Sequence, residues 1–280
     1  MTHTVYFNGQ FLSKTDVRIS PDDRGFLFGD GIYEVVRTYD GTFFALGPHL
    51  DRLRYGLRET LITGVDVAGL EAALPELIRR NDLAKGDATV YVEISRGAAP
   101  RTHHFPDPAV PATVYAQAGR FTPKGDPAVG IATITVPDIR WARCDIKTVQ
   151  LLPNCMANQR ARAAGALEAL FVRDGVVLEG SHTSVFFVLD GEVRTAPKSN
   201  YILPSITREI VLELCRAAQI PARETPVFHH DLPRVSEMFL AGTTMEVMPI
   251  VRVDGTTVGT GAPGPIASRL RGLFRERTRG

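Results

Sequence analysis

Five turn dipeptides constrain the fold of this chain more than any other feature of its sequence. Each is an Asn-Gly or Asp-Gly pair between runs of β-branched or aromatic residues: Asn8-Gly9, Asp40-Gly41, Asp174-Gly175, Asp190-Gly191 and Asp254-Gly255. Such pairs suit the left-handed backbone of two-residue hairpin turns. Because a tight hairpin joins antiparallel strands, the sequence predicts largely antiparallel sheets.

Helical patterns lie between these strands. Apolar residues recur every three or four positions in three segments: Leu50, Leu53, Leu57 and Leu61; Leu70, Leu74 and Leu77; and Ile206, Ile210, Leu214 and Ala217. This spacing is typical of amphipathic helices. A last helix is expected from about Pro265, a residue suited to a first helical position, to Arg277. Strands and helices together predict an α+β fold.

The chain of 280 residues is long enough for two domains. A stretch rich in Gly, Pro and polar residues, 119–127, marks the expected boundary. We therefore expect an N-terminal α+β domain at residues 1–120. A C-terminal domain with more strands, which carries Lys147, should span residues 121–280.

Charge and cysteine content exclude several classes of function. A net charge of +1 gives no reason to expect nucleic acid or an anionic membrane as a partner. The three cysteines, Cys144, Cys155 and Cys215, are odd in number and lack metal-ligand spacing, so we expect reduced thiols and no metal site. The start of the chain, Met1 to Tyr6, resembles no secretion signal, and no apolar run approaches the length of a membrane span. A cytoplasmic location is expected.

Lys147 is the first candidate for a catalytic residue. It is the only one of five lysines in a strand-like run, Asp145–Leu152, where alternation would place it on one face with Val149 and Leu151. Burial disfavours the ammonium form, so the amine could attack a carbonyl and form a Schiff base. The alternative, which spacing alone favours, is that its ammonium reaches solvent or pairs with Asp145.

Three further segments could bind a phosphorylated heterocycle. Glu179 ends a strand-like run, where a carboxylate could keep a ring nitrogen protonated, or could simply be solvated. The loop before Ile206 and Thr207 leads into a helix, whose first amides could bind a phosphate, although Thr207 could equally cap that helix. The hydroxyls of Thr243 and Thr244 follow a predicted strand.

Three side chains with hydrogen-bond donors could hold anions. Arg52 borders the apolar stripe of its helix, where a guanidinium could bind a phosphate or lie on a solvated face. Arg101 and His103 alternate in an extended loop and could clamp a small carboxylate. A metal site at His103 and His104 is disfavoured, because adjacent side chains point apart in extended chain.

The order and spacing of several motifs resemble those of fold-type IV pyridoxal-phosphate enzymes, most of all the D-amino-acid aminotransferase branch. The resemblance extends from about Val5 to Arg271 and rests on the segments 24–34, 101–103, 145–148, 179–180, 206–208 and 243–246. Any one motif is much less specific than the ordered set. A homodimer is implied by this resemblance.

The resemblance also implies roles for individual residues. Lys147 would match the lysine that binds pyridoxal 5'-phosphate and moves the substrate proton, and Glu179 the carboxylate on the pyridine nitrogen. Arg52, Ile206, Thr207, Thr243 and Thr244 would match the phosphate site, with Leu203 behind the ring. The substrate α-carboxylate would contact Tyr33, Arg101 and His103.

Three positions depart from the family pattern. Ser205 stands where Gly is frequent, Ser184 where Asn is usual, and His182 where small hydroxyl residues are usual. Ser205 could hinder close approach of the backbone to the phosphate, and His182 could narrow the substrate pocket.

The expected function is transfer of an amino group between a D-amino acid such as D-alanine and a 2-oxo acid, 2-oxoglutarate or pyruvate, with ping-pong kinetics. Within the same fold, the alternatives are a branched-chain L-amino-acid aminotransferase, an (R)-selective amine transaminase and an aminodeoxychorismate lyase. A binding protein without catalytic activity is the alternative from another class.

Overall fold

The computed structural model describes residues 3–279, and the chain divides into two compact units. Unit 1 comprises Met1–Thr122 with Ile146–Gln150, and unit 2 comprises Pro123–Asp145 with Leu151–Gly280. The main division follows residue 122, close to the boundary expected after residue 120. Residues 1, 2 and 280, which include the start of the N-terminal segment considered above, lie outside the described residues.

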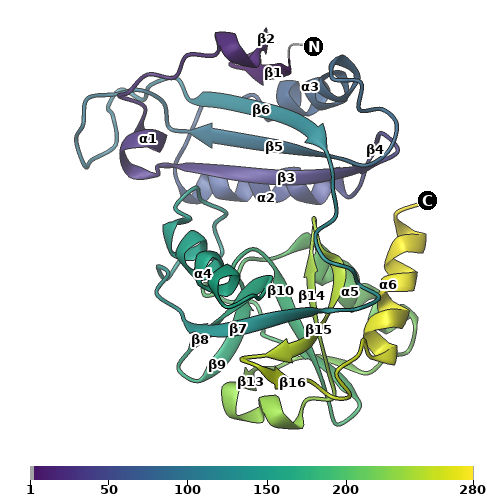
Figure 1. Ribbon diagram of the computed structural model, residues 1–280. Coiled ribbons are helices and arrows are strands. Elements are labelled where there is room, and N and C mark those ends of the chain that lie inside the picture. Colours follow the sequence, from purple (N-terminus) through teal and green to yellow (C-terminus); the bar gives the residue numbers. More distant parts are fainter. Residues whose placement is uncertain (1–2, 280) are drawn as a thin grey trace. The chain divides into compact units, whose positions relative to one another are not determined.

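Unit 1 is built on a six-stranded sheet in the order β2-β1-β6-β5-β3-β4, with every pair antiparallel (Figure 1). Its elements are β1 Thr4–Phe7, β2 Gln10–Ser13, η1 Lys14–Asp16, α1 Arg24–Phe28, β3 Gly31–Tyr39, β4 Thr42–Phe43, α2 Leu46–Glu59, α3 Val67–Arg80, β5 Ala88–Ser95 and β6 Thr113–Arg120.

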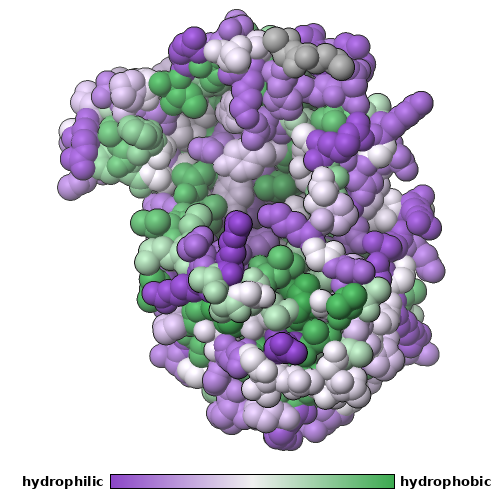
Figure 2. Space-filling view, viewed as in Figure 1, coloured by the Kyte–Doolittle hydropathy of each residue, from purple (hydrophilic) through white to green (hydrophobic). Residues whose placement is uncertain are grey.

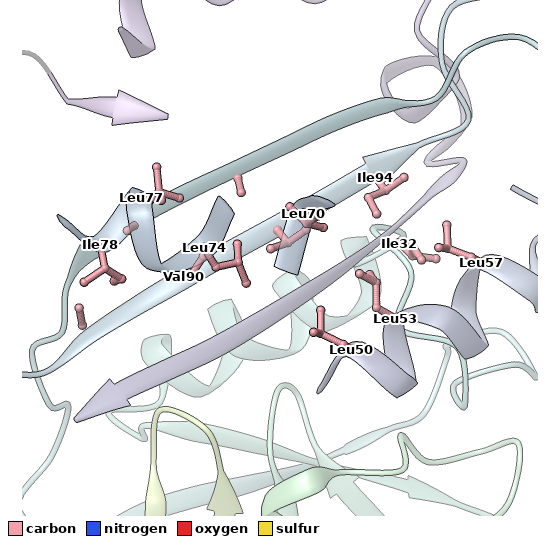
Figure 3. Packing of buried hydrophobic residues seen from close by; sticks show 14 of the residues in the cluster. Ile32, Leu50, Leu53, Leu57, Leu70, Leu74, Leu77, Ile78, Val90 and Ile94 are labelled. Carbon is pink, nitrogen blue, oxygen red and sulfur yellow. The ribbon is translucent and has the colours of Figure 1, made fainter. Parts of the chain in front are cut away.

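The core of unit 1 lies where α2 and α3 pack on this sheet (Figure 3). Leu50, Leu53 and Leu57 of α2 lie near Ile32 of β3, and Leu74 of α3 is fully buried near Val90 of β5. Strand alternation sends Ile32, Glu34 and Val36 to the buried face and leaves Tyr33 and Val35 half-buried on the other.

Unit 2 contains a ten-stranded sheet whose main path is β12-β11-β10-β14-β15-β7-β8-β9-β13, with β16 paired to β15. Most pairs are antiparallel, and β7 is parallel to both of its neighbours. Its elements are β7 Ile131–Pro137, α4 Leu152–Ala163, β8 Glu168–Arg173, β9 Val176–Gly180, β10 Ser184–Leu189, β11 Glu192–Thr195, α5 Ile206–Ala217, β12 Ala222–Glu224, β13 Val227–Phe228, η2 His229–Arg234, β14 Glu237–Gly242, β15 Glu246–Val253, β16 Thr256–Thr257 and α6 Pro265–Arg277.

All five predicted hairpins are confirmed. They join β1 to β2, β3 to β4, β8 to β9, β10 to β11 and β15 to β16, each as an antiparallel pair. Both residues of every turn dipeptide have positive φ, for example 47° at Asn8 and 85° at Gly9. This is the backbone of a type I′ turn, whose twist matches that of the flanking strands.

The helical patterns locate α2, α3, α5 and α6, with one correction. Helix α2 ends at Glu59, so Leu61 does not continue its apolar face. Leu61 has a φ of 55° and is 65% exposed, because the chain leaves the helix through a left-handed residue. Helices α1 and α4 had no sequence prediction, and α4 buries only the small residues Ala157 and Ala161, which leave little apolar periodicity.

The expected strand at Asp145–Leu152 is wrong. Only Thr148 forms an isolated bridge, with Ile32, and Leu152 already begins α4. Ile146 and Thr148 are buried while Lys147 and Val149 are half-buried, the reverse of the expected facing. Backbone bonds from Tyr33 N to Lys147 O and from Val149 N to Gly31 O hold the segment on β3. Lys147 therefore belongs to unit 1, not to the C-terminal domain in which it was expected.

Candidate active site

Lys147 presents its amine to an aromatic ring within unit 1. Its Nζ lies 4.2 Å from the ring centroid of Tyr33, and the Tyr33 amide donates to the Lys147 carbonyl over 2.9 Å. Asp145, the alternative partner of Lys147, pairs with Arg143 at 2.9 Å. The amine is thus half-buried against Tyr33, with its backbone fixed to β3.

A buried carboxylate joins Arg52 to a histidine in the same unit. Glu34 Oε1 accepts from Arg52 Nε at 2.6 Å, and Oε2 accepts from Arg52 Nη2 at 2.9 Å. His49 Nδ1 lies 2.8 Å from Glu34 Oε2. Arg52 is therefore not on a solvated face, since its side chain is 9% exposed. A paired guanidinium of this kind has a fixed orientation.

The pKa values of Glu34 and His49 are both shifted, because the two side chains are buried beside each other and beside Arg52. Burial alone would raise the pKa of Glu34, but Arg52 and His49 outweigh it and lower that pKa to about 2. Burial lowers the pKa of His49, and the positive charges of Arg52 and Lys147 lower it further against the opposing effect of Glu34. Lys147 therefore acts electrostatically on this group, and a neutral His49 is favoured at pH 7.

Arg101 and His103 lie exposed in the loop between β5 and β6 of unit 1. Both approach one side chain, Phe28, at the end of α1: the Arg101 Cζ lies 5.2 Å from the ring centroid, and the His103 ring centroid lies 5.9 Å away. The structure therefore places the two predicted carboxylate-binding side chains together around a common ring.

In unit 2, Glu179 lies buried at the end of β9. Its carboxylate accepts from Arg140 Nη1 and from the Leu203 amide at 3.1 Å, and Arg140 is fixed in turn by Asp138 at 2.9 Å. Burial raises the pKa of Glu179, whereas Arg140 and the Leu203 amide oppose that shift by stabilising the charge. The alternative of a solvated strand end is thereby excluded.

The start of α5 also lies in unit 2. Ser205 caps the helix, because its side chain accepts from the Arg208 amide at 3.2 Å, so Thr207 is not the cap. A helix cannot satisfy the amides of its own first turn, and this positive end attracts anions. Ile206 and Thr207 therefore lie at a helix end that could hold an anion, and Leu203, three residues before it, is bound to Glu179.

Two turns adjoin at one end of the unit 2 sheet. Thr243 and Thr244 follow β14, which ends at Gly242. Gly242 lies close to Thr183 of the second turn, because a Cβ built on Gly242 would lie 3.5 Å from the Thr183 Cγ2. In the neighbouring turn, His182 Nδ1 lies 2.9 Å from the fully buried carboxylate of Glu168. The His182 side chain is 44% exposed, so its ring has a buried edge and an open one.

The predicted residues thus form two sets, each within one unit. Unit 1 contains Lys147, Tyr33, Arg52, Arg101 and His103, and unit 2 contains Glu179, His182, Leu203, Ile206, Thr207, Thr243 and Thr244. The sequence did not predict the partners that fix them, Glu34, His49, Asp138, Arg140 and Glu168. The alternation of β3 could have indicated Glu34, which lies among buried apolar neighbours, but the other partners carry no local signal.

Among residues 3–279, no cluster of His, Cys, Asp and Glu could hold a metal ion. The side chains do fit pyridoxal phosphate, because a buried carboxylate suits its ring nitrogen and the start of α5 suits its phosphate. In the same described range, no helix is long and apolar enough to cross a membrane.

Comparison with known proteins gives concordant matches. The model of the amino-transferase class IV family matches residues 31–253. The D-alanine aminotransferase of Bacillus licheniformis is 36% identical over 271 residues, covering 95% of this chain and 94% of that protein. That of Staphylococcus haemolyticus is 37% identical over 274 residues, covering 97% and 96%.

Solved structures share the fold over nearly the whole chain. The branched-chain amino acid aminotransferase of Escherichia coli has a TM-score of 0.90 and 24% identity, covering 99% of this chain and 94% of that one. The corresponding enzyme from T.th., solved with pyridoxamine 5'-phosphate, has a TM-score of 0.90 and 26% identity over the same shares.

Proposed function

Because this chain belongs to the amino-transferase class IV family, we propose that it transfers an amino group between a D-amino acid, such as D-alanine, and a 2-oxo acid. The substrate assignment is supported by D-alanine aminotransferases of 36% and 37% identity that the chain covers almost completely. The mixed, largely antiparallel fold and the aminotransferase chemistry agree with what the sequence predicts.

One observation carries the cofactor assignment. Buried Glu179 accepts from the amide of Leu203, three residues before the start of α5, so a carboxylate and an anion-binding helix end are fixed to each other in unit 2. A phosphorylated pyridine carries a basic ring nitrogen and a dianionic phosphate. The T.th. relative, solved with pyridoxamine 5'-phosphate, supports the same choice.

Pyridoxal 5'-phosphate, once bound, supplies the electron sink that makes the substrate α-proton acidic. Lys147 would bind it covalently through Nζ and then accept and return that proton. Glu179 would hold a proton on the ring nitrogen, with Leu203 against the ring. The phosphate would bind the amides of Ile206 and Thr207, the hydroxyls of Thr243 and Thr244, and Arg52.

The substrate carboxylate would bind Arg101, His103 and Tyr33. Fixing the carboxylate on one side decides which face of Cα presents its hydrogen to Lys147, and therefore which enantiomer reacts. His182, whose ring has an open edge, would line the substrate pocket and restrict the side chains accepted.

The test is a panel of D- and L-amino acids assayed with 2-oxoglutarate and pyruvate. We expect D-alanine to react, parallel lines in double-reciprocal plots, and a label at Lys147 after borohydride reduction and peptide mapping. Lys147→Ala should abolish the label and the activity, whereas Lys124→Ala, at an exposed lysine, should change neither. A label at another lysine, or activity with L-amino acids alone, would refute the assignment.

A branched-chain L-amino-acid aminotransferase is the second candidate, because the solved T.th. relative is named a branched-chain amino acid aminotransferase. Its signature in the same panel is L-leucine reacting faster than D-alanine. Reaction of an amine without a carboxylate would indicate an (R)-selective amine transaminase. Pyruvate release without a second 2-oxo acid would indicate the lyase.

We also propose a cytoplasmic homodimer. Three free thiols, Cys144, Cys155 and Cys215, suit a reducing compartment. Exposed apolar side chains of unit 1, Ile19 and Phe26, border a cavity of about 570 Å³, as expected of a surface that another subunit covers. Figure 2 shows that hydrophobic side chains, in green, gather in patches on the face of the molecule in view. Light scattering should give twice the mass of one chain, and cell fractionation should place the protein with cytoplasmic markers.

A further inference from the structure

We propose that Phe28 is a positioning residue that sets the geometry of the two carboxylate-binding side chains, Arg101 and His103. This inference rests on the proposed function, because it assumes that those two side chains hold the substrate carboxylate. It adds a residue in α1 that none of the roles assigned above includes.

Phe28 is the centre of a cluster of cationic and aromatic side chains. Its ring centroid lies 4.6 Å from Arg24 Cζ, 5.2 Å from Arg101 Cζ and 5.9 Å from the His103 ring centroid, which it meets edge to face at 67°. A guanidinium within about 6 Å of an aromatic centroid is attracted to the negative face of the ring. The half-buried Phe28 ring thus lies beside both of the exposed side chains, Arg101 and His103.

The ring itself is held in place by its neighbours. Asp30 Oδ2 accepts from Arg24 Nε and from Arg96 Nε at 2.8 Å each, and both arginines are buried. Burial alone would raise the pKa of Asp30, but the bonds from Arg96 and Arg24 outweigh it and lower that pKa. Gly29, with a φ of 64°, ends α1 directly after Phe28. The ring is therefore carried on an anchored turn.

The same anchor fixes the backbone of the loop. Arg24 Nη1 donates to the Thr102 carbonyl at 2.7 Å, between the two cationic residues, and Arg96 Cζ lies 3.5 Å from the ring centroid of Phe105. The Thr102 amide also donates to the Pro100 carbonyl at 2.8 Å, so the backbone turns at this point. With the intervening carbonyl held, both side chains meet the Phe28 ring.

The Arg101 side chain is exposed. No carboxylate pairs with it anywhere in the described range, so an incoming anion meets a guanidinium without a competing partner. A long exposed side chain loses rotamer freedom when it binds. Contact with Phe28 reduces that loss by limiting the conformations of Arg101 before the substrate arrives.

The test compares Phe28→Leu with wild-type holoenzyme in D-alanine and 2-oxoglutarate transamination. We expect the KM for D-alanine to rise roughly threefold to tenfold, the scale of one or two lost cation–aromatic contacts, with kcat within about twofold. Phe28→Tyr, which keeps the ring face, should restore the KM. Phe228→Leu, the same substitution at a 41% exposed position of β13, should leave both constants unchanged.

A double-mutant cycle separates positioning from general damage. In an Arg101→Leu background, Phe28→Leu should raise KM by a smaller factor than in wild type, because His103 is then the one carboxylate-binding side chain that the ring still positions. If Phe28→Leu raises KM by the same factor in both backgrounds, or lowers kcat without raising KM, the inference is overturned. If Phe28→Leu does not fold, Phe28→Met provides the same comparison without an aromatic face.

Failure of the proposed function would look different. If Arg101→Leu leaves kcat/KM for D-alanine unchanged, the carboxylate assignment itself is wrong. If Arg101→Leu impairs the reaction and Phe28→Leu does not, only the role of Phe28 is wrong.

Discussion

At the scale of single residues, Glu168 is a fully buried carboxylate that is held by hydrogen bonds. Its carboxylate is fully buried and accepts from the Ala169 amide, the hydroxyls of Ser181 and Thr183, and His182 Nδ1. Burial alone would raise the pKa of Glu168, but these donors outweigh it, with His182 the strongest, and lower that pKa to about 2. The ionised carboxylate therefore holds the turn that presents His182.

We predict that Glu168→Gln lowers the free energy of unfolding at pH 7 by roughly 2–4 kcal/mol, since a buried charge network loses its central anion. A carboxylate whose pKa is lowered on folding contributes stability above its unfolded pKa of about 4.3 and loses it as the pH falls toward 2. Urea unfolding should therefore show the gap between variant and wild type shrinking from pH 5 to pH 3.

Glu76→Gln is the matched control. The side-chain hydrogen bonds of Arg79 and Arg80 lower the pKa of Glu76 to about 2 as well, but this carboxylate lies at the surface of α3. Solvent screens such exposed pairs, so the variant should unfold almost as wild type does. Equal losses in the two variants would mean that burial is not what makes Glu168 important.

At the scale of elements, the start of α5 depends on the departure at Ser205. The serine side chain caps the helix by accepting from the Arg208 amide. We predict that Ser205→Ala costs about 1 kcal/mol of unfolding free energy, and that Ser205→Gly costs only a few tenths. Chemical unfolding of both variants tests this, and a larger loss in Ser205→Gly would contradict the capping role.

The hairpin turns allow a second prediction at this scale. Gly41 and Gly191 have φ angles of 78° and 77°, but a Cβ at Gly41 would lie 2.6 Å from the Ala84 carbonyl oxygen while one at Gly191 would meet open space. Gly191→Ala should cost about 1 kcal/mol for its left-handed backbone. Gly41→Ala should cost clearly more, because the Ala84 backbone must also move. Thermal unfolding of the two variants measures the difference, and equal losses would refute it.

The sequence predicted those strands and helices that are determined by residues close together in the chain. The hairpins follow from the backbone preferences of Asn-Gly and Asp-Gly, and α5 and α6 from apolar periodicity and Pro265. The segment at Lys147 was misread as a strand, because its bonds come from β3, more than a hundred residues earlier in the chain. Likewise, Arg140 reaches Glu179 and Glu168 reaches His182 across several strands and turns, so no spacing rule could identify these pairs.

At the scale of the whole molecule, each unit has its own hydrophobic core and carries part of the predicted site residues. Unit 1 contains Lys147 and Arg52, and unit 2 contains Glu179 and Thr207. A ligand that binds only the native chain stabilises it by mass action, by about 2.7 kcal/mol at a hundred times its dissociation constant. Stability therefore reports cofactor binding without any assay of activity.

We predict that pyridoxal 5'-phosphate raises the Tm of the cofactor-free protein more than pyridoxal does at equal concentration, because only the former places a phosphate at the start of α5. Thr207→Val removes one hydroxyl donor there while keeping the shape of the side chain. In this variant the rise in Tm with pyridoxal 5'-phosphate should therefore exceed the rise with pyridoxal by less than it does in wild type. Thr257→Val, at an exposed position in β16, should leave the difference unchanged. Equal stabilisation of wild type by both ligands would mean that α5 does not receive the phosphate, whatever reaction the chain performs.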